Sequence, residues 1–222
     1  MMLSSINIAT AATVAACTAT LSYYFYSHFR TKKQETVSEL KDMYNLLPHP
    51  EGGFYAETYR SVLNVNASYG TRSASTAIYF LITPGSVSRL HKIAADECWH
   101  FYKGGSMTVL EIDSTGKLTK TILGHDLLNG EKVQHVVKAG TWFGSYPNKG
   151  TGYSFVGCTV APGFDFQDFE LASRSTLIKQ FSQHEKEIKM LTEGLPEMQI
   201  FLNFHHQFSG NPNPTVPNNS DE

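Results

Sequence analysis

Short runs of apolar and β-forming residues fill the middle of the chain, and Gly, Pro, Asn and Asp separate them at fairly regular intervals. Many short strands with turn residues between them are typical of an antiparallel sandwich or barrel. We therefore predict an all-β domain in which successive side chains of a strand point to opposite faces. Strands are expected over residues 54–60, 73–83, 87–93, 97–103, 107–112, 117–123, 133–137, 141–146 and 153–160.

The chain changes to helical spacing on both sides of this β region. Apolar residues three and four positions apart predict a short N-terminal helix over 36–47, which Pro48 ends. The same spacing predicts a single C-terminal helix over 174–191, and Gly194 and Pro196 follow it. Its apolar stripe consists of Leu177, Phe181, Ile188 and Leu191.

The N-terminal segment has the features of a membrane anchor. No Asp, Glu, Lys or Arg precedes Arg30, and the stretch 6–29 is long enough to cross a bilayer as a helix. The aromatic run 23–26 ends this stretch, and Lys32 and Lys33 follow Arg30. Because basic residues stay on the cytoplasmic side, these features predict a membrane-spanning helix and a membrane-anchored protein with its main domain in the cytosol.

Two other interpretations of this segment stay open. A cleaved secretory signal would have a charged region at its start, and a mitochondrial transit peptide would be rich in Arg. Neither feature is present before Arg30. The sequence does not distinguish the endoplasmic reticulum from the outer mitochondrial membrane as the location of the anchor.

These patterns together predict the organisation of the chain. We expect a membrane anchor with its basic flank at 1–35, a barrel domain at 36–173, a C-terminal helix and extension at 174–208, and a disordered tail at 209–222. The tail is rich in Pro, Asn and Ser, which bury little apolar surface. A net charge of −2 provides no basic field for a phosphate backbone, so we expect no nucleic-acid partner.

One spacing in the β region carries chemical information. Gly85 is followed after five residues by His91, Glu97 comes six positions later, and Gly104 ends the pattern. This resembles the first motif of the cupin superfamily, G-x5-H-x-H-x3-4-E-x6-G. The resemblance implies a jelly-roll β-barrel in which His91 and Glu97 face the interior on adjacent strands.

The chain departs from the cupin pattern at two places. The second His of the first motif is Ile93, and the His of the second motif is replaced by Phe143. Two of the family's four metal ligands, His91 and Glu97, therefore remain, whereas a firm transition-metal site usually has three or more protein ligands. The cofactor is unknown, and a divalent metal at these two residues is the weaker hypothesis.

Further segments narrow the resemblance to uncharacterised cupins that are grouped as a domain of unknown function, with an RmlC-like jelly roll. The match runs from about residue 46 to residue 172 and implies a homodimer with a small-molecule pocket and no agreed activity. The segments that carry it are His49–Tyr55, Glu57–Ser61, Ser88–His91, Trp99–His100, Ala139–Trp142 and Ala161–Phe166.

The candidate catalytic residues are His91, Glu97 and Tyr79. A His beside a carboxylate is the usual arrangement of a general base and the group that orients it, and a Tyr can act as the acid partner. The simpler interpretations are a hydrogen-bonded core histidine and a core tyrosine. A carboxylate that shares a strand face with aromatic rings is expected to have a raised pKa.

The candidate ligand-binding residues are polar or aromatic groups within the matched segments: Glu51, Arg60, Trp99, His100, Trp142 and Asp165. Arg60 has the planar fork that suits a carboxylate or phosphate, but an ion pair with Glu57 is the structural alternative. Trp142 borders the lost ligand position, where an indole suits a flat or sugar-like ligand. His100 should face away from Glu97, and Asp165 needs a partner if it is buried.

The preferred functional hypothesis is a barrel that binds a small polar molecule, either sugar-like or a small acid. The alternatives are a metal-free isomerase or epimerase with His91 as base, a metal-dependent cupin enzyme that uses His91, Glu97 and a third ligand such as His100 or Glu51, and a membrane-tethered structural dimer. Filling of the barrel by Ile93 and Phe143 would favour the structural alternative.

Overall fold

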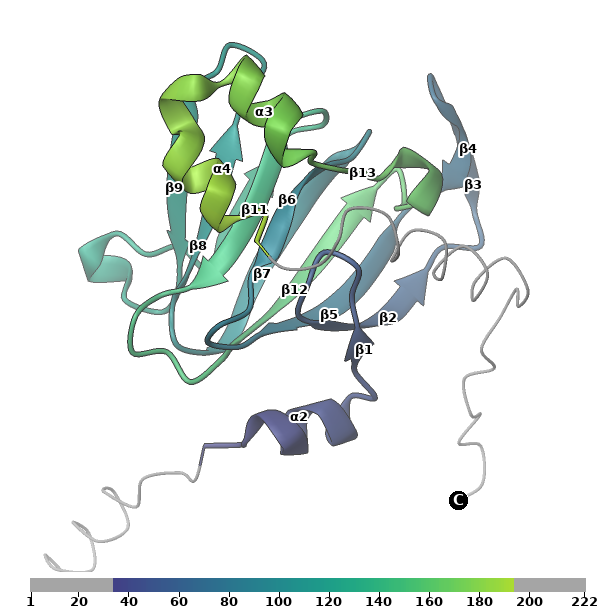
Figure 1. Cartoon of the computed structure of the whole chain (residues 1–222). Coiled ribbons are helices and arrows are strands. Elements are labelled where there is room, and N and C mark those ends of the chain that lie inside the picture. The colour runs from purple at the N-terminus through teal and green to yellow at the C-terminus, as the bar shows by residue number, and fades with distance from the viewer. Residues whose placement is uncertain (1–33, 194–222) are drawn as a thin grey trace, which may run out of the picture. The chain divides into compact units, whose positions relative to one another are not determined.

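Two antiparallel sheets face each other in the computed structural model, which describes residues 34–193 (Figure 1). The chain divides into residues 1–36 and a second unit from Val37 onward, and the fold described here belongs to the second. The first sheet contains, in spatial order, β1 (Leu47–Pro48), β2 (Phe54–Arg60), β5 (Thr76–Ile82), β12 (Ser154–Ala161), β7 (Asp96–Gly104) and β10 (Gln134–Val137). The second contains β13 (Glu170–Leu171), β6 (Ser88–Lys92), β11 (Trp142–Pro147), β8 (Met107–Ile112) and β9 (Leu118–Leu123).

The remaining elements are short. The helices are α2 (Val37–Met43), α3 (Arg174–Gln180) and α4 (Glu185–Met190), and the 3-10 turns are η1 (Leu127–Asn129), η2 (Phe166–Asp168) and η3 (Ser182–His184). A hairpin of β3 (Asn64–Ala67) and β4 (Gly70–Ser73) projects from the barrel (Figure 1). The sequence analysis did not predict this hairpin, because its strands are mainly polar and none of their residues is buried.

The main core lies between the two sheets. Strand β7 shows the alternation that produces it, because Glu97, Trp99 and Phe101 are buried while Cys98 and His100 between them are only partly buried. Phe80 from β5 and Phe143 from β11 join Trp99 from opposite sheets in one cluster. The interior of the barrel is therefore mainly aromatic and aliphatic, and the buried carboxylate of Glu97 lies within it.

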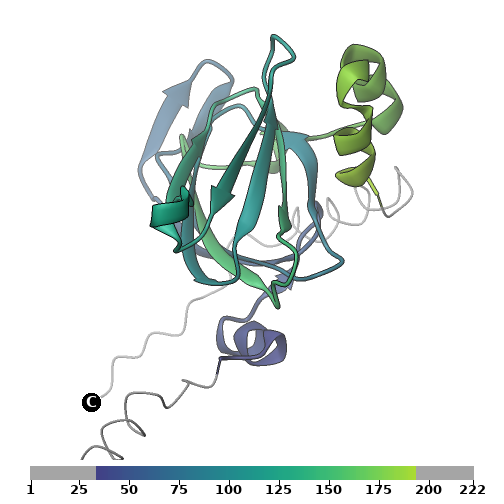
Figure 2. The same cartoon turned by 90° about the vertical axis from the view of Figure 1, so that its left-hand side faces the viewer.

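A second cluster covers the outer face of the five-stranded sheet. Helices α3 and α4 lie on that side of the barrel (Figure 2), and Leu177 and Ile188 pack on Leu90 and Leu110 of the sheet. The predicted single helix over 174–191 is broken, since Phe181 adopts the non-helical φ/ψ of −133° and 59° between α3 and η3. The apolar stripe that predicted the helix is nevertheless buried as a unit.

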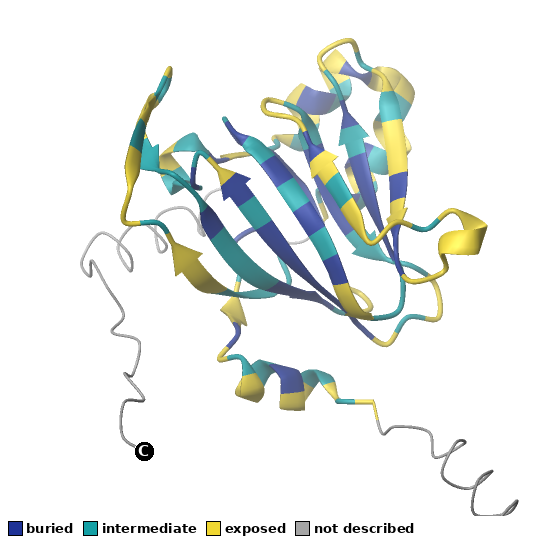
Figure 3. Cartoon of the chain, turned by 180° about the vertical axis from the view of Figure 1, so that it is seen from behind, coloured by how far each residue is buried: buried dark blue, intermediate teal, exposed yellow. Residues whose placement is uncertain are grey.

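A third cluster lies on the outer face of the six-stranded sheet. Leu40 forms the buried stripe of α2 (Figure 3) and joins Leu81 and Phe155 of the sheet. The ring of Tyr79 belongs to this cluster and lies 4.8 Å from the ring of Tyr44, centroid to centroid. Other side chains of this face, such as Tyr102 and Val136, are 45% and 40% exposed. The homodimer that the family resemblance implies stays a prediction.

The predicted fold class needs a correction at the N-terminus. Within residues 34–193, no helix is long and apolar enough to cross a membrane. The stretch 6–29, on which the prediction of a membrane-spanning helix and a membrane-anchored location was based, lies outside the described residues. The fold is therefore given as a mostly β jelly roll with C-terminal helices, and the membrane helix and the membrane location are withdrawn.

Candidate functional site

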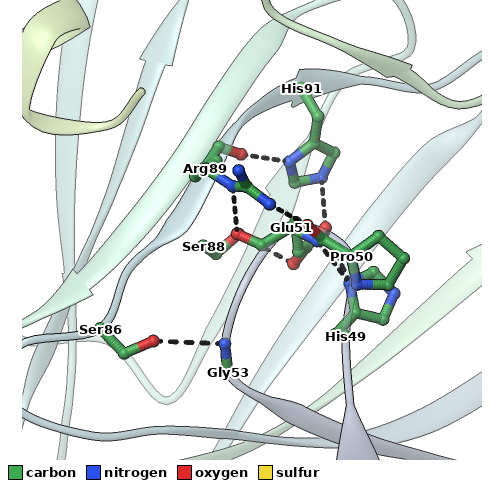
Figure 4. A network of polar contacts seen from close by, with 8 residues as sticks. All are labelled: His49, Pro50, Glu51, Gly53, Ser86, Ser88, Arg89 and His91. Atoms are coloured by element: carbon green, nitrogen blue, oxygen red, sulfur yellow. Dashed lines mark hydrogen bonds and ion pairs between the residues drawn. The ribbon is translucent and has the colours of Figure 1, made fainter. Parts of the chain in front are cut away.

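A network of buried polar side chains lies at one side of the barrel interior (Figure 4). Glu51 stands at its centre, on the turn between β1 and β2. One carboxylate oxygen, Oε1, accepts a hydrogen bond of 2.8 Å from Ser88 Oγ, and the other, Oε2, lies 3.2 Å from Nε2 of His91. The network therefore joins the N-terminal turn to strand β6 of the opposite sheet.

The turn that carries Glu51 is pressed closely against the end of β6. Gly52 has a φ of +109°, and a Cβ atom added there would lie 2.1 Å from the carbonyl oxygen of Val87. Only glycine combines this backbone conformation with such a close approach. The backbone of Glu51 is also fixed, because its carbonyl oxygen accepts a 2.8 Å hydrogen bond from the N–H of Arg89. The guanidinium of Arg89 donates to the carbonyls of Pro50 and Glu51.

The hydrogen bonds of His91 define its tautomer. Nδ1 lies 2.6 Å from the carbonyl oxygen of Arg89, and because a carbonyl only accepts, Nδ1 carries a proton. Nε2 lies 3.2 Å from Oε2 of Glu51, so the other ring nitrogen faces the central carboxylate of the network.

His49 completes this network in a neutral state. Its Nδ1 accepts a 3.3 Å hydrogen bond from the backbone N–H of Glu51, which needs a lone pair on that nitrogen. Burial lowers the pKa of His49 to about 4, and the nearby carboxylate of Glu51 opposes this shift only in part. Nδ1 of His49 lies 3.6 Å from Oε2 of Glu51, but the two groups do not form an ion pair at neutral pH because His49 is uncharged.

Glu97 is a second buried carboxyl group in the barrel. Burial and, to a smaller extent, the charge of Glu51 raise the pKa of Glu97 to about 8, against a hydrogen bond with the Cys158 thiol that lowers it. At neutral pH the group is therefore mainly protonated and acts as a hydrogen-bond donor. The same environment raises the pKa of the Cys158 thiol well above its usual value, so this cysteine is not a thiolate.

Trp99 lies on the same face of β7 as Glu97 and is fully buried. Its indole ring packs edge-to-face on Phe80 and Phe143, with centroid distances of 6.0 and 6.4 Å. Among the described residues, Nε1 has no hydrogen-bond partner. A buried N–H without a partner is costly, so Trp99 presents an unused donor inside the barrel.

The geometry at His91 does not suit a metal ion. Phe143, which replaces the His of the second cupin motif, pairs with His91 across β11 and β6, and the two ring centroids are 4.1 Å apart. Phe169 stacks on His91 at 5.2 Å. Within residues 34–193, no three His, Cys, Asp or Glu side chains are grouped so that they could hold an ion. His91 and Glu97 therefore do not gain the third ligand that a metal-dependent site requires.

The structure brings four of the predicted site residues into the barrel interior and separates the others. His91, Glu51, Glu97 and Trp99 are buried there. Tyr79 points to the opposite face of its sheet, among Tyr44 and Phe155, so it is not placed to act as the acid partner of His91.

His100 also faces outward, as strand alternation predicted. Its Nε2 is 2.5 Å from Thr159 Oγ1, and its Nδ1 is 3.3 Å from Gln134 Nε2. Burial lowers the pKa of His100. Because His100 lies on the outer face of the sheet, its position does not support a role in binding a ligand inside the barrel.

Arg60, Asp165 and Trp142 lie outside the buried network. Arg60 makes a bidentate ion pair with Glu57, at 2.9 and 2.6 Å, and its third donor group binds the carbonyl of Phe164. Asp165 caps η2 by accepting a 2.9 Å hydrogen bond from the N–H of Gln167. Trp142 packs on the outer face of the five-stranded sheet beneath the C-terminal helices.

The sequence analysis gave no role to His49, Ser88 and Arg89. All three lie in segments that carry the family resemblance. Their place in these segments was the one sequence feature that could have indicated a role in the site. Their function depends on a contact between the β1–β2 turn and β6, and Glu51 and Ser88 are separated by 37 positions along the chain. No local pattern of hydrophobic and polar residues records such a contact.

Comparison with known proteins agrees with a cupin fold. The family model described as Cupin superfamily (DUF985) matches residues 38–172. An uncharacterized Saccharomyces cerevisiae protein, YML079W, is 31% identical over 178 residues, which cover 72% of this chain and 88% of the yeast protein.

Two solved structures are similar as well. A hypothetical protein from Leishmania major is 35% identical with a TM-score of 0.68, and covers 72% of this chain and 100% of its own. Protein SO0799 from Shewanella oneidensis is 40% identical with a TM-score of 0.68, and covers 73% of this chain and 100% of its own.

The fold and the position of His91 and Glu97 thus define a jelly-roll barrel of the cupin class. The length of the family match makes the assignment more specific. The chain belongs to the cupin family DUF985, and the resemblance predicted from its motifs is confirmed. The helices α3 and α4 follow the last residue that the family model matches.

Proposed function

We propose that the barrel interior binds a small molecule that presents oxygen acceptors, either a small carboxylic acid or a sugar-like compound, without a metal ion. The single observation that carries this proposal is the buried N–H of Trp99, which has no acceptor among the described residues. The raised pKa of Glu97 supplies a second donor on the same face of β7. Two donors in an apolar surrounding favour an oxygen atom as the group they bind.

The network around Glu51 supports this proposal by fixing the other wall of the site. One ring nitrogen of His91 faces Arg89 and the other faces Glu51. The aromatic rings of Phe143 and Phe169 pack against the imidazole ring. A rigid, hydrogen-bonded wall of this kind positions a ligand with little loss of side-chain entropy. His91 is therefore assigned to shaping the site and not to proton abstraction.

The enzyme alternatives receive less support from the geometry. In an isomerase, the basic nitrogen of His91 would have to face the substrate, but Nε2 faces Glu51 at 3.2 Å. A metal-dependent enzyme would need a third ligand such as His100 or Glu51, but His100 is bound to Thr159 on the outer face and Glu51 is bound to Ser88. Ile93 and Phe143 are both buried in the core, which also agrees with a barrel that is only structural. The experiment below separates binding from that alternative.

Calorimetric titration of the full chain tests the proposal, with acetate, pyruvate, malonate and glucose as probes. We expect at least one of these probes to bind, and Trp99→Phe to weaken that binding by about tenfold, the effect of one lost hydrogen bond. Tyr153→Phe is the matched control, because Tyr153 also has a buried polar atom without a partner but belongs to the cluster beneath α2.

The pH dependence of binding provides a second readout. A ligand that accepts a hydrogen bond from protonated Glu97 should bind more weakly as the pH rises through about 8, the pKa of that carboxyl group. Glu97→Gln keeps a donor and should remove this dependence. If none of the probes binds the full chain, the barrel is structural and the proposal is wrong.

A further inference from the structure

A cavity of about 400 Å³ lies outside the barrel, where the C-terminal helices meet the five-stranded sheet. Trp142 and Phe181 contribute aromatic walls, and the other lining groups include Thr176 and Gln180 of α3. The volume is within the range of sites for small molecules. The cavity is separate from the buried network, because Trp142 points to the outer face of β11 and its neighbour Phe143 points into the barrel.

The indole of Trp142 is held in place by charged neighbours. The ammonium group of Lys92 lies 4.5 Å from the centre of the indole ring and forms a 2.8 Å ion pair with Glu170. The ammonium group therefore occupies one face of the indole, and the ring also packs in the cluster beneath the C-terminal helices.

The polar groups of the lining determine which ligands suit the cavity. Its ionisable side chains are Lys92, which is paired, and the carboxylates of Asp113 and Glu170. Excess negative charge disfavours an anionic ligand. The hydroxyl of Thr176 and the amide of Gln180 can each donate and accept, which suits ligands with many hydroxyl groups.

We infer that this cavity is a second binding site and that it takes a neutral polyhydroxylated ring, the size of a monosaccharide or disaccharide. The apolar side of such a ring packs between the aromatic walls formed by Trp142 and Phe181, and its hydroxyl groups reach Thr176, Gln180 and Glu170. The site depends on α3, which follows the family match at residues 38–172. It combines residues of the matched domain with residues of α3, and it is independent of the function proposed for the barrel.

Ligand-observed NMR and calorimetry on the full chain test this inference, with methyl glucoside, methyl galactoside, methyl mannoside, maltose and cellobiose as probes. We expect one or more of these sugars to bind, and glucuronate to bind less well than methyl glucoside because of the carboxylates at the cavity. Gln180→Trp should weaken the binding by about tenfold or more, since the larger side chain takes up cavity volume.

The control variant is Lys179→Trp, because Lys179 is exposed on the same helix but does not line the cavity. Thr176→Phe, one turn before Gln180, is a second blocking variant if Gln180→Trp does not fold. Trp99→Phe should leave sugar binding at this cavity unchanged, which separates it from the barrel site. The inference is overturned if none of the sugars binds, or if Lys179→Trp weakens binding as much as Gln180→Trp.

Discussion

Trp142 and Phe143 are neighbours on β11, but their side chains lie on opposite faces of the sheet and in different chemical surroundings. Phe143 is fully buried against His91 in the barrel, at the position where the cupin motif would place a metal ligand. Trp142 is partly exposed and borders a polar cavity beneath α3. The comparison teaches that one strand presents a closely packed ring to the barrel and, one residue earlier, a partly exposed ring to the cavity on the other side of the sheet.

The largest expected effect comes from truncating the inner ring. Phe143→Ala should lower the free energy of unfolding by about 3–5 kcal/mol, because it leaves a cavity in a closely packed core. Trp142→Ala should cost only about 1–2 kcal/mol, since its ring is partly exposed and the neighbouring side chains can relax. Urea unfolding of both variants measures the difference. Equal losses would contradict the distinction between the two faces.

The next effect is a pH dependence that arises from the barrel interior. The pKa of Glu97 is raised from its ordinary value of 4.5 to about 8 in the folded protein, so between these values the folded state holds a proton that the unfolded state has lost. Stability therefore falls as the pH rises from about 5 to about 8, by up to about 1.4 kcal/mol per pH unit.

The matched variant for this prediction is Glu97→Gln, which cannot titrate. The free energy of unfolding of wild type minus that of the variant should decrease over this pH window. His49 acts in the opposite sense, because its pKa is lowered to about 4 and its contribution is lost as the pH falls from about 6.5. Both proteins contain His49, so its contribution cancels in the difference. A flat difference between pH 5 and 8 would argue against a protonated Glu97.

Smaller losses of stability should distinguish a carboxylate of the buried network from one in an exposed ion pair of the same sheet. Glu51→Gln should cost about 1.5–3 kcal/mol, because Ser88 and His91 lose a charged partner in a buried site. Glu57→Gln should cost at most about 1 kcal/mol, since the Glu57 and Arg60 side chains are 38% and 43% exposed. Chemical unfolding at one pH measures both. If Glu57→Gln lowered the free energy of unfolding more than Glu51→Gln, Glu51 would not be the carboxylate on which the buried network depends.

Much of the barrel could be predicted from the sequence because its signals are local. The predicted strands over 54–60 and 107–112 coincide with β2 and β8, and the alternation in β7 placed Glu97 inward and His100 outward. The two buried residues of the motif followed from its spacing. The break at Phe181 could not be predicted, because the apolar stripe of the C-terminal helices continues across it.

The candidate site was only partly predictable, for a physical reason. The partners of Glu51 come from β6 and are far away in the chain, so the network depends on tertiary packing. Trp142 was expected at a pocket because of its place beside the lost ligand, but strand alternation puts it on the other side of β11 from that ligand. Tyr79 was included by residue type alone, and the same alternation places it beneath α2.

The most direct test concerns the protonation state of Glu97, on which the proposed barrel site depends. Carbon-13 NMR of the full chain, labelled at the glutamate carboxyl carbons, follows each carboxyl group as the pH changes. We predict one resonance with a midpoint near 8, the pKa of Glu97, which disappears in Glu97→Gln. A Glu97 resonance that titrates near 4.5 would show a carboxylate in the barrel at neutral pH, and would contradict a site built from two hydrogen-bond donors.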